Sequence, residues 1–190
     1  MGNDNNTKTN QVLLLGLEYS GKTSFLQRLT ILHSGEIESV NYDPTIGMNF
    51  ASFSVKNTKV DFWDIGGDPL SRSYWPTFYK NLKIGLVLYF VNISDESTFE
   101  ASRKELLKLI NEEELKNTRF YLVFNCFLAK NVTLDDSTLE IEKEKVNTFI
   151  NKIRAYPINL FDDRVDWEIL SVIRSKISDT MLSKIFKFAT

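Results

Sequence analysis

The sequence predicts an α/β fold in which a mostly parallel sheet is covered by helices on both faces. Fully apolar runs at residues 12–15, 84–91 and 120–124 are typical of strands buried on both faces of a parallel sheet. Segments with helical spacing of apolar residues follow these runs, at 25–32, 97–112 and 139–154. This alternation along a chain of 190 residues favours a single sheet whose crossover connections are helices.

The composition suits one globular domain and argues against several classes of protein. The chain is 43% hydrophobic and 25% charged, with a net charge of −2, so nothing favours nucleic acid as a partner. Cys126 is the only cysteine, which excludes a disulfide framework and a cysteine-based metal site. The longest apolar run, 84–91, is far shorter than the ~20 residues that span a bilayer. We expect a cytoplasmic monomer.

Residues 1–10 are polar and rich in asparagine, which predicts a disordered tail ahead of one domain at 11–190. Gly2 suggests N-myristoylation, but that pattern requires Ser or Thr at position 6, where this chain has Asn6. An unmodified tail is therefore the competing interpretation.

The stretch from Gly16 to Thr23 carries the clearest chemical signal in the chain. It follows the apolar run 12–15, precedes the amphipathic stretch 25–32 and has the pattern of a phosphate-binding P-loop, GxxxxGKT. Gly16 and Gly21 permit backbone angles that a side chain would disfavour, so the loop can wrap its N–H groups around phosphate oxygens. The helix adds its positive N-terminal end. We expect Lys22 to reach the β- and γ-phosphates and the Thr23 hydroxyl to ligate Mg²⁺.

The middle of the chain predicts a long loop, a hairpin and the start of a further helix. Residues 34–47 are typical of a long loop, which in a compact domain is often functional. The runs 48–55 and 60–64 are separated by a link short enough for a hairpin, so one edge strand is antiparallel. Ser97 and Glu100 predict a capping box that opens the next helix.

The C-terminal third completes a sheet of six strands. A loop at 126–136 precedes a helix at 139–154, and residues 156–159 predict a weak last strand. Asp162 or Asp163 could cap a final helix that runs to about Phe188, with an apolar stripe that begins at Ile169.

Two segments beyond the loop complete a candidate nucleotide site. The segment Pro44-Thr45-Ile46-Gly47 lies between the first helix and the hairpin, where the Thr45 hydroxyl could complete a magnesium shell. The segment Asp64-Ile65-Gly66-Gly67 ends a strand, where an aspartate can hold Mg²⁺ through water and a glycine amide can contact a γ-phosphate. Each segment alone has an ordinary structural explanation, but their order and spacing with the loop favour a nucleotide switch.

On these strings, GLEYSGKTS, PTIGMNF and WDIGGDPLSRSYWPTFYKN, the chain resembles the Arf and Arf-like (ADP-ribosylation factor) small GTPases. The resemblance is strong over residues 11–110 and rests on the fold pattern beyond them. It implies a P-loop NTPase three-layer sandwich that binds Mg²⁺ and GTP or GDP and acts as a switch in vesicle or membrane trafficking. Effectors, an exchange factor and an activating protein would contact switch I around Thr45, switch II after Asp64, and the hairpin between them. Peripheral attachment to intracellular membranes would be possible.

The resemblance also assigns site residues. Asp64 would hold magnesium through water together with Thr23 and Thr45, and Gly67 would be the switch II glycine. Trp63 and Trp75 match aromatic positions of switch II, which serve core packing, an effector surface or both. The phosphate contacts would come from Glu18, Tyr19, Ser20, Gly21, Lys22, Thr23, Ser24, Thr45 and Gly67.

Asp68 stands where the family has the glutamine that orients the attacking water, so it is the candidate catalytic residue. An aspartate is shorter and charged, and near a γ-phosphate its charge would be repelled or neutralised by a proton. We expect GTP hydrolysis, if it occurs, to be slow.

The run for guanine recognition, normally Asn-Lys-x-Asp, is also altered. Here it reads Asn125-Cys126-Phe127-Leu128-Ala129, and whether Asn125 or Cys126 takes the asparagine position, the aspartate is lost. Charged hydrogen bonds contribute about 1.5–3 kcal/mol each, so two lost bonds would lower affinity by roughly 10²–10⁴. We expect Asn125, Cys126 and Phe127 to line the base site, with weak discrimination between guanine and adenine.

Two further departures and two competing functions remain. Tyr19 puts a large side chain into the phosphate loop, where it could cover the nucleotide or face solvent, and the polar tail cannot form the family's amphipathic N-terminal helix. The alternative to a switch is a pseudo-GTPase scaffold with weak or unselective nucleotide binding. A small P-loop kinase would need an arginine-rich lid, whereas the arginines after residue 80 are scattered.

Overall fold

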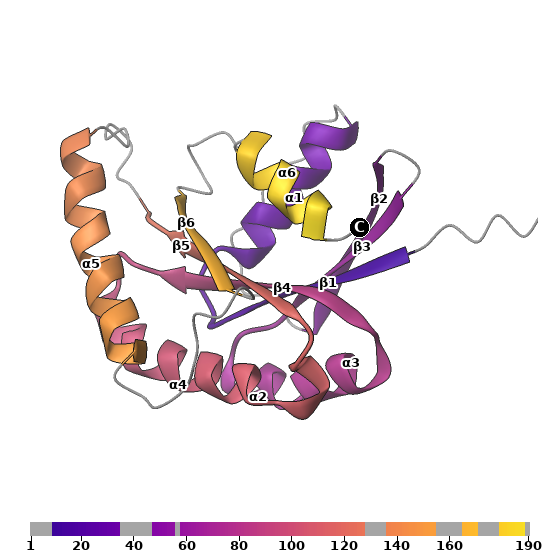
Figure 1. The fold of residues 1–190 in the computed structure, drawn as a ribbon, viewed down its shortest axis with the longest axis horizontal. Helices are drawn as coiled ribbons and strands as arrows, with labels where there is room; N and C mark the ends of the chain where they lie inside the picture. The colour runs from indigo at the N-terminus through magenta and orange to yellow at the C-terminus, as the bar shows by residue number, and fades with distance from the viewer. Residues whose placement is uncertain are drawn as a thin grey trace, which may run out of the picture.

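The computed structural model describes residues 9–34, 47–55, 58–127, 136–154, 165–170 and 179–188. In these segments six strands form one sheet in the order β2-β3-β1-β4-β5-β6, surrounded by helices (Figure 1). The strands are β1 (Thr9–Gly16), β2 (Met48–Val55), β3 (Thr58–Ile65), β4 (Ile84–Asn92), β5 (Arg119–Asn125) and β6 (Val165–Leu170). The helices are α1 (Lys22–Ser34), α2 (Pro69–Arg72), α3 (Trp75–Asn81), α4 (Phe99–Ile110), α5 (Asp136–Arg154) and α6 (Asp179–Phe188), with short 3-10 turns at Glu96–Thr98 and Glu113–Leu115.

The strand pairing confirms the predicted sheet. Strand β1 pairs in parallel with β3 and β4, and β4–β5 and β5–β6 are also parallel. Strand β2 pairs antiparallel with β3 alone and lies at the edge of the sheet. The predicted hairpin therefore supplies the one antiparallel edge strand among the described strands.

The alternation of side chains along β1 explains why helices cover both faces of the sheet. Val12 and Leu14 are fully buried in a cluster with α1 and α6, whereas Leu13 and Leu15 are fully buried in a second cluster with α3, α4 and α5. Successive side chains of a strand point to opposite faces, so a wholly apolar strand must be covered twice. Figure 1 shows α1 and α6 on one side of the sheet and α2, α3 and α4 on the other.

The end of the chain corrects the prediction of one long final helix. Residues 165–170 form β6, which pairs with β5 from Phe120↔Val165 to Asn125↔Leu170, and the described helix, α6, begins only at Asp179. The parallel pairing with β5 outweighs the helical stripe, because tertiary context overrides local periodicity. The weak strand predicted at 156–159, and its neighbours Asp162 and Asp163, lie outside the described residues.

Two smaller predictions also need correction. Strand β1 begins at Thr9, so the last two residues assigned to a disordered tail pair with β3. The capping box at Ser97 and Glu100 is absent. Asp95 accepts a hydrogen bond from the Ser97 amide, and Glu100 instead pairs with Arg103.

Within the described segments, no helix combines the length and apolar character needed to cross a membrane.

We predict that Phe149→Ala destabilises the fold by about 3–5 kcal/mol, because it opens a cavity at the centre of one core cluster. The Phe149 ring is 1% exposed and meets Phe99 and Phe124 edge-on, at centroid distances of 5.4 and 5.6 Å. The matched control is Ile141→Ala on the same helix, whose side chain is 59% exposed and whose loss should cost less than about 0.5 kcal/mol. Urea unfolding of both variants measures the difference, and equal midpoints would contradict the packing described.

Candidate functional site

The candidate residues gather at the carboxyl ends of the parallel strands. Strand β1 ends at Gly16, β3 at Ile65 and β5 at Asn125, and these strands lie close together in the sheet. Helix α1 covers one face of the sheet, while the chain after β3 continues to the other face through α2 and α3. Ligands of open α/β sheets bind at this kind of edge, where the crossovers diverge.

The loop between β1 and α1 adopts the backbone that its glycines predicted. Gly16 has a φ of +141° and Gly21 a φ of +96°, and a Cβ at Gly16 would lie 2.4 Å from the Phe90 carbonyl oxygen. Tyr19 has a φ of +56°, in the left-handed region that non-glycine residues seldom adopt. Its side chain is 63% exposed, and the neighbouring Glu18 is exposed as well. The loop thus presents its backbone inward and these two side chains outward.

The Lys22 ammonium lies inside this loop. It donates hydrogen bonds to the carbonyl oxygens of Gly16 and Leu17 at 3.0 and 2.9 Å, and the side chain is 5% exposed. Burial lowers the Lys22 pKa to about 8, while the negative charges of Asp64, Glu18 and Asp68 act in the opposite direction. The Ser20 hydroxyl, itself bonded to the Leu17 carbonyl at 2.7 Å, lies 3.5 Å from the same nitrogen. A buried ammonium surrounded by backbone dipoles is well suited to an anionic ligand.

Thr23 and Asp64 form the candidate magnesium site. The Thr23 hydroxyl donates to Asp64 Oδ2 at 2.7 Å, which joins the start of α1 to the end of β3, and Asp64 is fully buried. Both groups offer oxygen ligands, which Mg²⁺ prefers along with phosphate oxygens and water. In the described part of the chain no group of three or more His, Cys, Asp or Glu side chains is placed to hold a metal. The donor set therefore fits Mg²⁺ in company with a phosphate. Thr45 lies outside the described residues.

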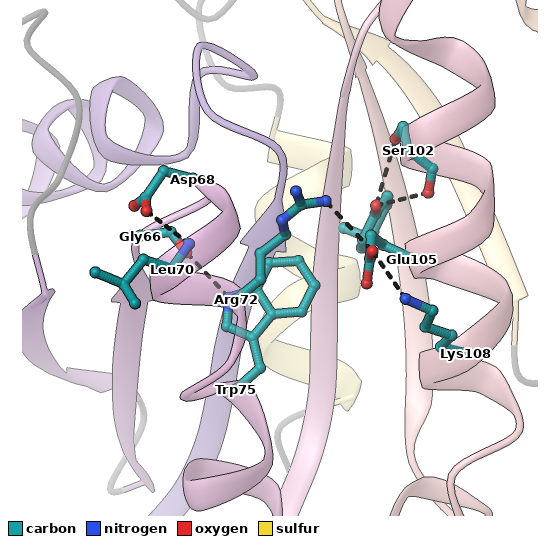
Figure 2. A network of polar contacts seen from close by, with 9 residues as sticks. Gly66, Asp68, Leu70, Arg72, Trp75, Ser102, Glu105 and Lys108 are labelled. Carbon is teal, nitrogen blue, oxygen red and sulfur yellow. Dashed lines mark hydrogen bonds and ion pairs between the residues drawn. The ribbon is translucent and has the colours of Figure 1, made fainter.

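The segment from Gly66 through α2 and α3, the expected switch II, begins in direct contact with the phosphate loop between β1 and α1. The Gly66 amide donates to the Gly47 carbonyl at 2.9 Å, and its own carbonyl accepts from Trp75 Nε1 at 3.0 Å (Figure 2). A Cβ placed on Gly67 would lie 2.4 Å from the Gly16 carbonyl oxygen, so only glycine fits there without a shift of the loop. Backbone motion at either the loop or Gly67 must therefore affect the other.

Asp68 has a structural role that the family resemblance did not suggest. It is the N-cap of α2, and its carboxylate accepts from the Leu70 amide at 3.0 Å (Figure 2). The same oxygen accepts from the Ser71 amide, also at 3.0 Å. Hydrogen bonding from Ser71 holds the Asp68 pKa below its usual value. We expected the Asp68 charge either to be repelled by a γ-phosphate or to be neutralised by a proton. The hydrogen bonds favour the first alternative, an ionised carboxylate directed at α2.

An ion pair ties switch II to the neighbouring helix. Arg72 Nη1 of α2 lies 3.3 Å from Glu105 Oε1 of α4, and Lys108 contacts the same carboxylate oxygen at 3.0 Å (Figure 2). On the same helix, the Ser102 carbonyl accepts a hydrogen bond from the Tyr89 hydroxyl at 2.8 Å. The pair joins residues 33 positions apart, so nothing in the local sequence pattern could have indicated it.

The base-recognition run divides into three different environments. Asn125 is fully buried and donates from Nδ2 to the Ser20 carbonyl at 3.0 Å, so it supports the loop between β1 and α1. Cys126 is 1% exposed in the core cluster, where burial raises its thiol pKa to about 11, and this environment does not favour its predicted role at the base. Phe127 is half-buried, and its ring lies 3.7 Å from the point where a Gly21 Cβ would be.

Exposed apolar side chains gather where the hairpin meets switch II. The Trp63 ring contacts those of Phe50 and Phe78, at centroid distances of 4.7 and 5.9 Å, and Phe50 is 48% exposed. Trp75, by contrast, is buried in the core. We call Phe50, Trp63 and Phe78, which are exposed or half-buried, the aromatic patch.

We predict that Asp68→Ala loosens α2, whereas Asp68→Asn leaves it intact, because asparagine caps a helix about as well as aspartate and alanine does not. Hydrogen exchange of the amides at 70–75 should be several-fold faster in the alanine variant. Equal exchange in Asp68→Ala and the unchanged protein would contradict the capping role.

Comparison with known proteins agrees with this geometry. The sequence profile of the ADP-ribosylation factor family matches residues 2–168. ADP-ribosylation factor-like protein 1 of Drosophila melanogaster is 34% identical over 164 residues, which cover 83% of this chain and 86% of that protein. The protein of the same name from Saccharomyces cerevisiae is 36% identical over 115 residues, 60% of this chain and 59% of its own. Among solved structures, the Arl6 BBS3 small GTPase from Trypanosoma brucei, with bound nucleotide analogue GppNp, matches with a TM-score of 0.67. The match covers 96% of this chain and 98% of that one, and at 18% sequence identity it supports the fold alone. The chain belongs to the ADP-ribosylation factor family of small GTPases.

Proposed function

We propose that this chain is a magnesium-dependent GTP- and GDP-binding switch in vesicle or membrane trafficking. The observation that carries the proposal is the Lys22 ammonium buried inside the loop beside the Thr23–Asp64 pair. A buried ammonium is costly without anionic or dipolar partners. A phosphate chain would supply negative charge to Lys22, and its Mg²⁺ would supply positive charge to the oxygens of Thr23 and Asp64. Thr23 and Thr45 would ligate Mg²⁺, Asp64 would hold it through water, and the bound ion would neutralise phosphate charge.

The switch would act through surfaces that border the nucleotide. Gly67 packs against the phosphate loop, so a γ-phosphate there would displace or order switch II. The aromatic patch lies on the adjoining hairpin and switch II, and exposed apolar patches of this kind commonly bind partner proteins. Effectors, an exchange factor and an activating protein are the proposed partners, acting on a monomer in the cytoplasm or at the surface of intracellular membranes.

The base site supports weaker selection of guanine than the family motif provides. Asn125 retains the bond that holds the loop, but position 128, where the aspartate would stand, is a leucine. Phe127 lies close enough to the loop to stack on a base, and stacking accepts any base. We therefore propose binding of guanine nucleotides with reduced discrimination against adenine.

Slow hydrolysis follows from the engagement of Asp68. Its carboxylate is held by the first amides of α2 and is ionised, so it is poorly placed to orient a water beside a charged γ-phosphate. Turnover would then depend on a partner, and the switch would persist in its triphosphate state without one.

We predict that the purified protein releases a guanine nucleotide on denaturation. Calorimetric titration of the emptied protein with GDP, GTP, ADP and ATP should show guanine preferred by less than about 10²-fold, since the charged contact to the base edge is lost. An exclusive guanine preference would contradict the weakened base site. A protein that releases and binds no nucleotide would favour the scaffold alternative.

We predict that Asp68→Gln raises the single-turnover rate of GTP hydrolysis by at least roughly tenfold, because a glutamine can orient the attacking water. Asp68→Ala should leave the slow rate unchanged. Rapid hydrolysis by the unchanged protein, lost on Asp68→Ala, would instead make Asp68 itself the catalytic group.

A further inference from the structure

We infer that Asn49, on the hairpin strand β2, is a positioning residue of the magnesium site. The inference rests on the proposed function, since it assigns a role toward Mg²⁺ bound with nucleotide. Asn49 belongs to the string PTIGMNF, but the resemblance assigned it no role, and it precedes Asp64 by fifteen positions.

The Asn49 side chain reaches Asp64 directly. Its Nδ2 donates to Asp64 Oδ2 at 3.0 Å, and this is the same oxygen that accepts the Thr23 hydroxyl at 2.7 Å. Two donors on one oxygen, from β2 and from α1, fix the rotation of the fully buried carboxylate. Partners that orient a metal-binding group in this way contribute to metal affinity without touching the metal.

The strand register makes this contact specific. Asn49 and Asp64 are directly opposite in the antiparallel pairing of β2 with β3, and the Gly66 amide bonds to the Gly47 carbonyl beside them. A displacement of β2 by one position along β3 would turn Asn49 to the other face and break the bond. Asp64 can therefore keep this donor only while the hairpin holds its present register.

The test measures how Mg²⁺ slows release of a fluorescent guanosine diphosphate from the loaded protein. Loss of an orienting partner typically weakens metal affinity by about 10–100-fold, so Asn49→Ala should raise the protective Mg²⁺ concentration by that factor. Release in excess chelator should stay the same, since the phosphate loop is intact. Ser54→Ala, at an exposed position on the same strand, is the matched control and should leave both quantities unchanged.

Asn49→Val repeats the measurement with a residue that favours strands, in case the alanine variant does not fold. A protective concentration within about twofold of the unchanged protein in the folded variants would overturn the inference and leave the proposed function standing. Unchanged protein that retains no nucleotide would overturn the proposed function and this inference together. Hydrogen exchange of 48–55 supplies a second readout: magnesium should slow it in the unchanged protein and have little effect in Asn49→Ala.

Discussion

The burial of one ammonium group, Lys22, within a loop of backbone carbonyls is the interaction on which the rest of the site depends. Removing such a charge from water is costly, and the carbonyls of Gly16 and Leu17 offset the cost only because glycine angles bend the loop around it. Burial lowers the pKa of Lys22 to about 8. We therefore propose that a bound nucleotide replaces the carbonyl partners of Lys22 with phosphate oxygens, which carry full negative charge.

The other parts of the site touch this loop from three directions. Asn125 supports it from the end of β5, Gly67 packs against it from switch II, and Thr23 links it to Asp64. Each contact joins segments far apart in the sequence that the sheet brings to one edge. We therefore expect a change in the ligand at the loop to affect switch II and, through Asp64 and Asn49, the hairpin.

Local patterns predicted much of this arrangement. The fully apolar strands, the loop with its two glycines and the hairpin pairing follow from short stretches read alone, and the family resemblance placed Asp64 and Gly67. Features that depend on contacts between distant segments could not be predicted in this way. The prediction of helix at β6 was wrong because pairing with β5 decides its conformation, although Val165, Trp167 and Ile169 do alternate with acidic residues as in a strand. The cap made by Asp68, the Arg72–Glu105 pair and the Asn49 bond likewise need the folded chain.

The central claim, that Lys22 is held in the loop to receive phosphate, is tested most directly by the affinity for magnesium–GTP with and without this side chain. Calorimetric titration of the unchanged protein and of Lys22→Ala makes the comparison. Each charged hydrogen bond contributes about 1.5–3 kcal/mol, so the account predicts a loss of affinity of roughly tenfold or more in the variant. Equal affinities in the two folded proteins would contradict it.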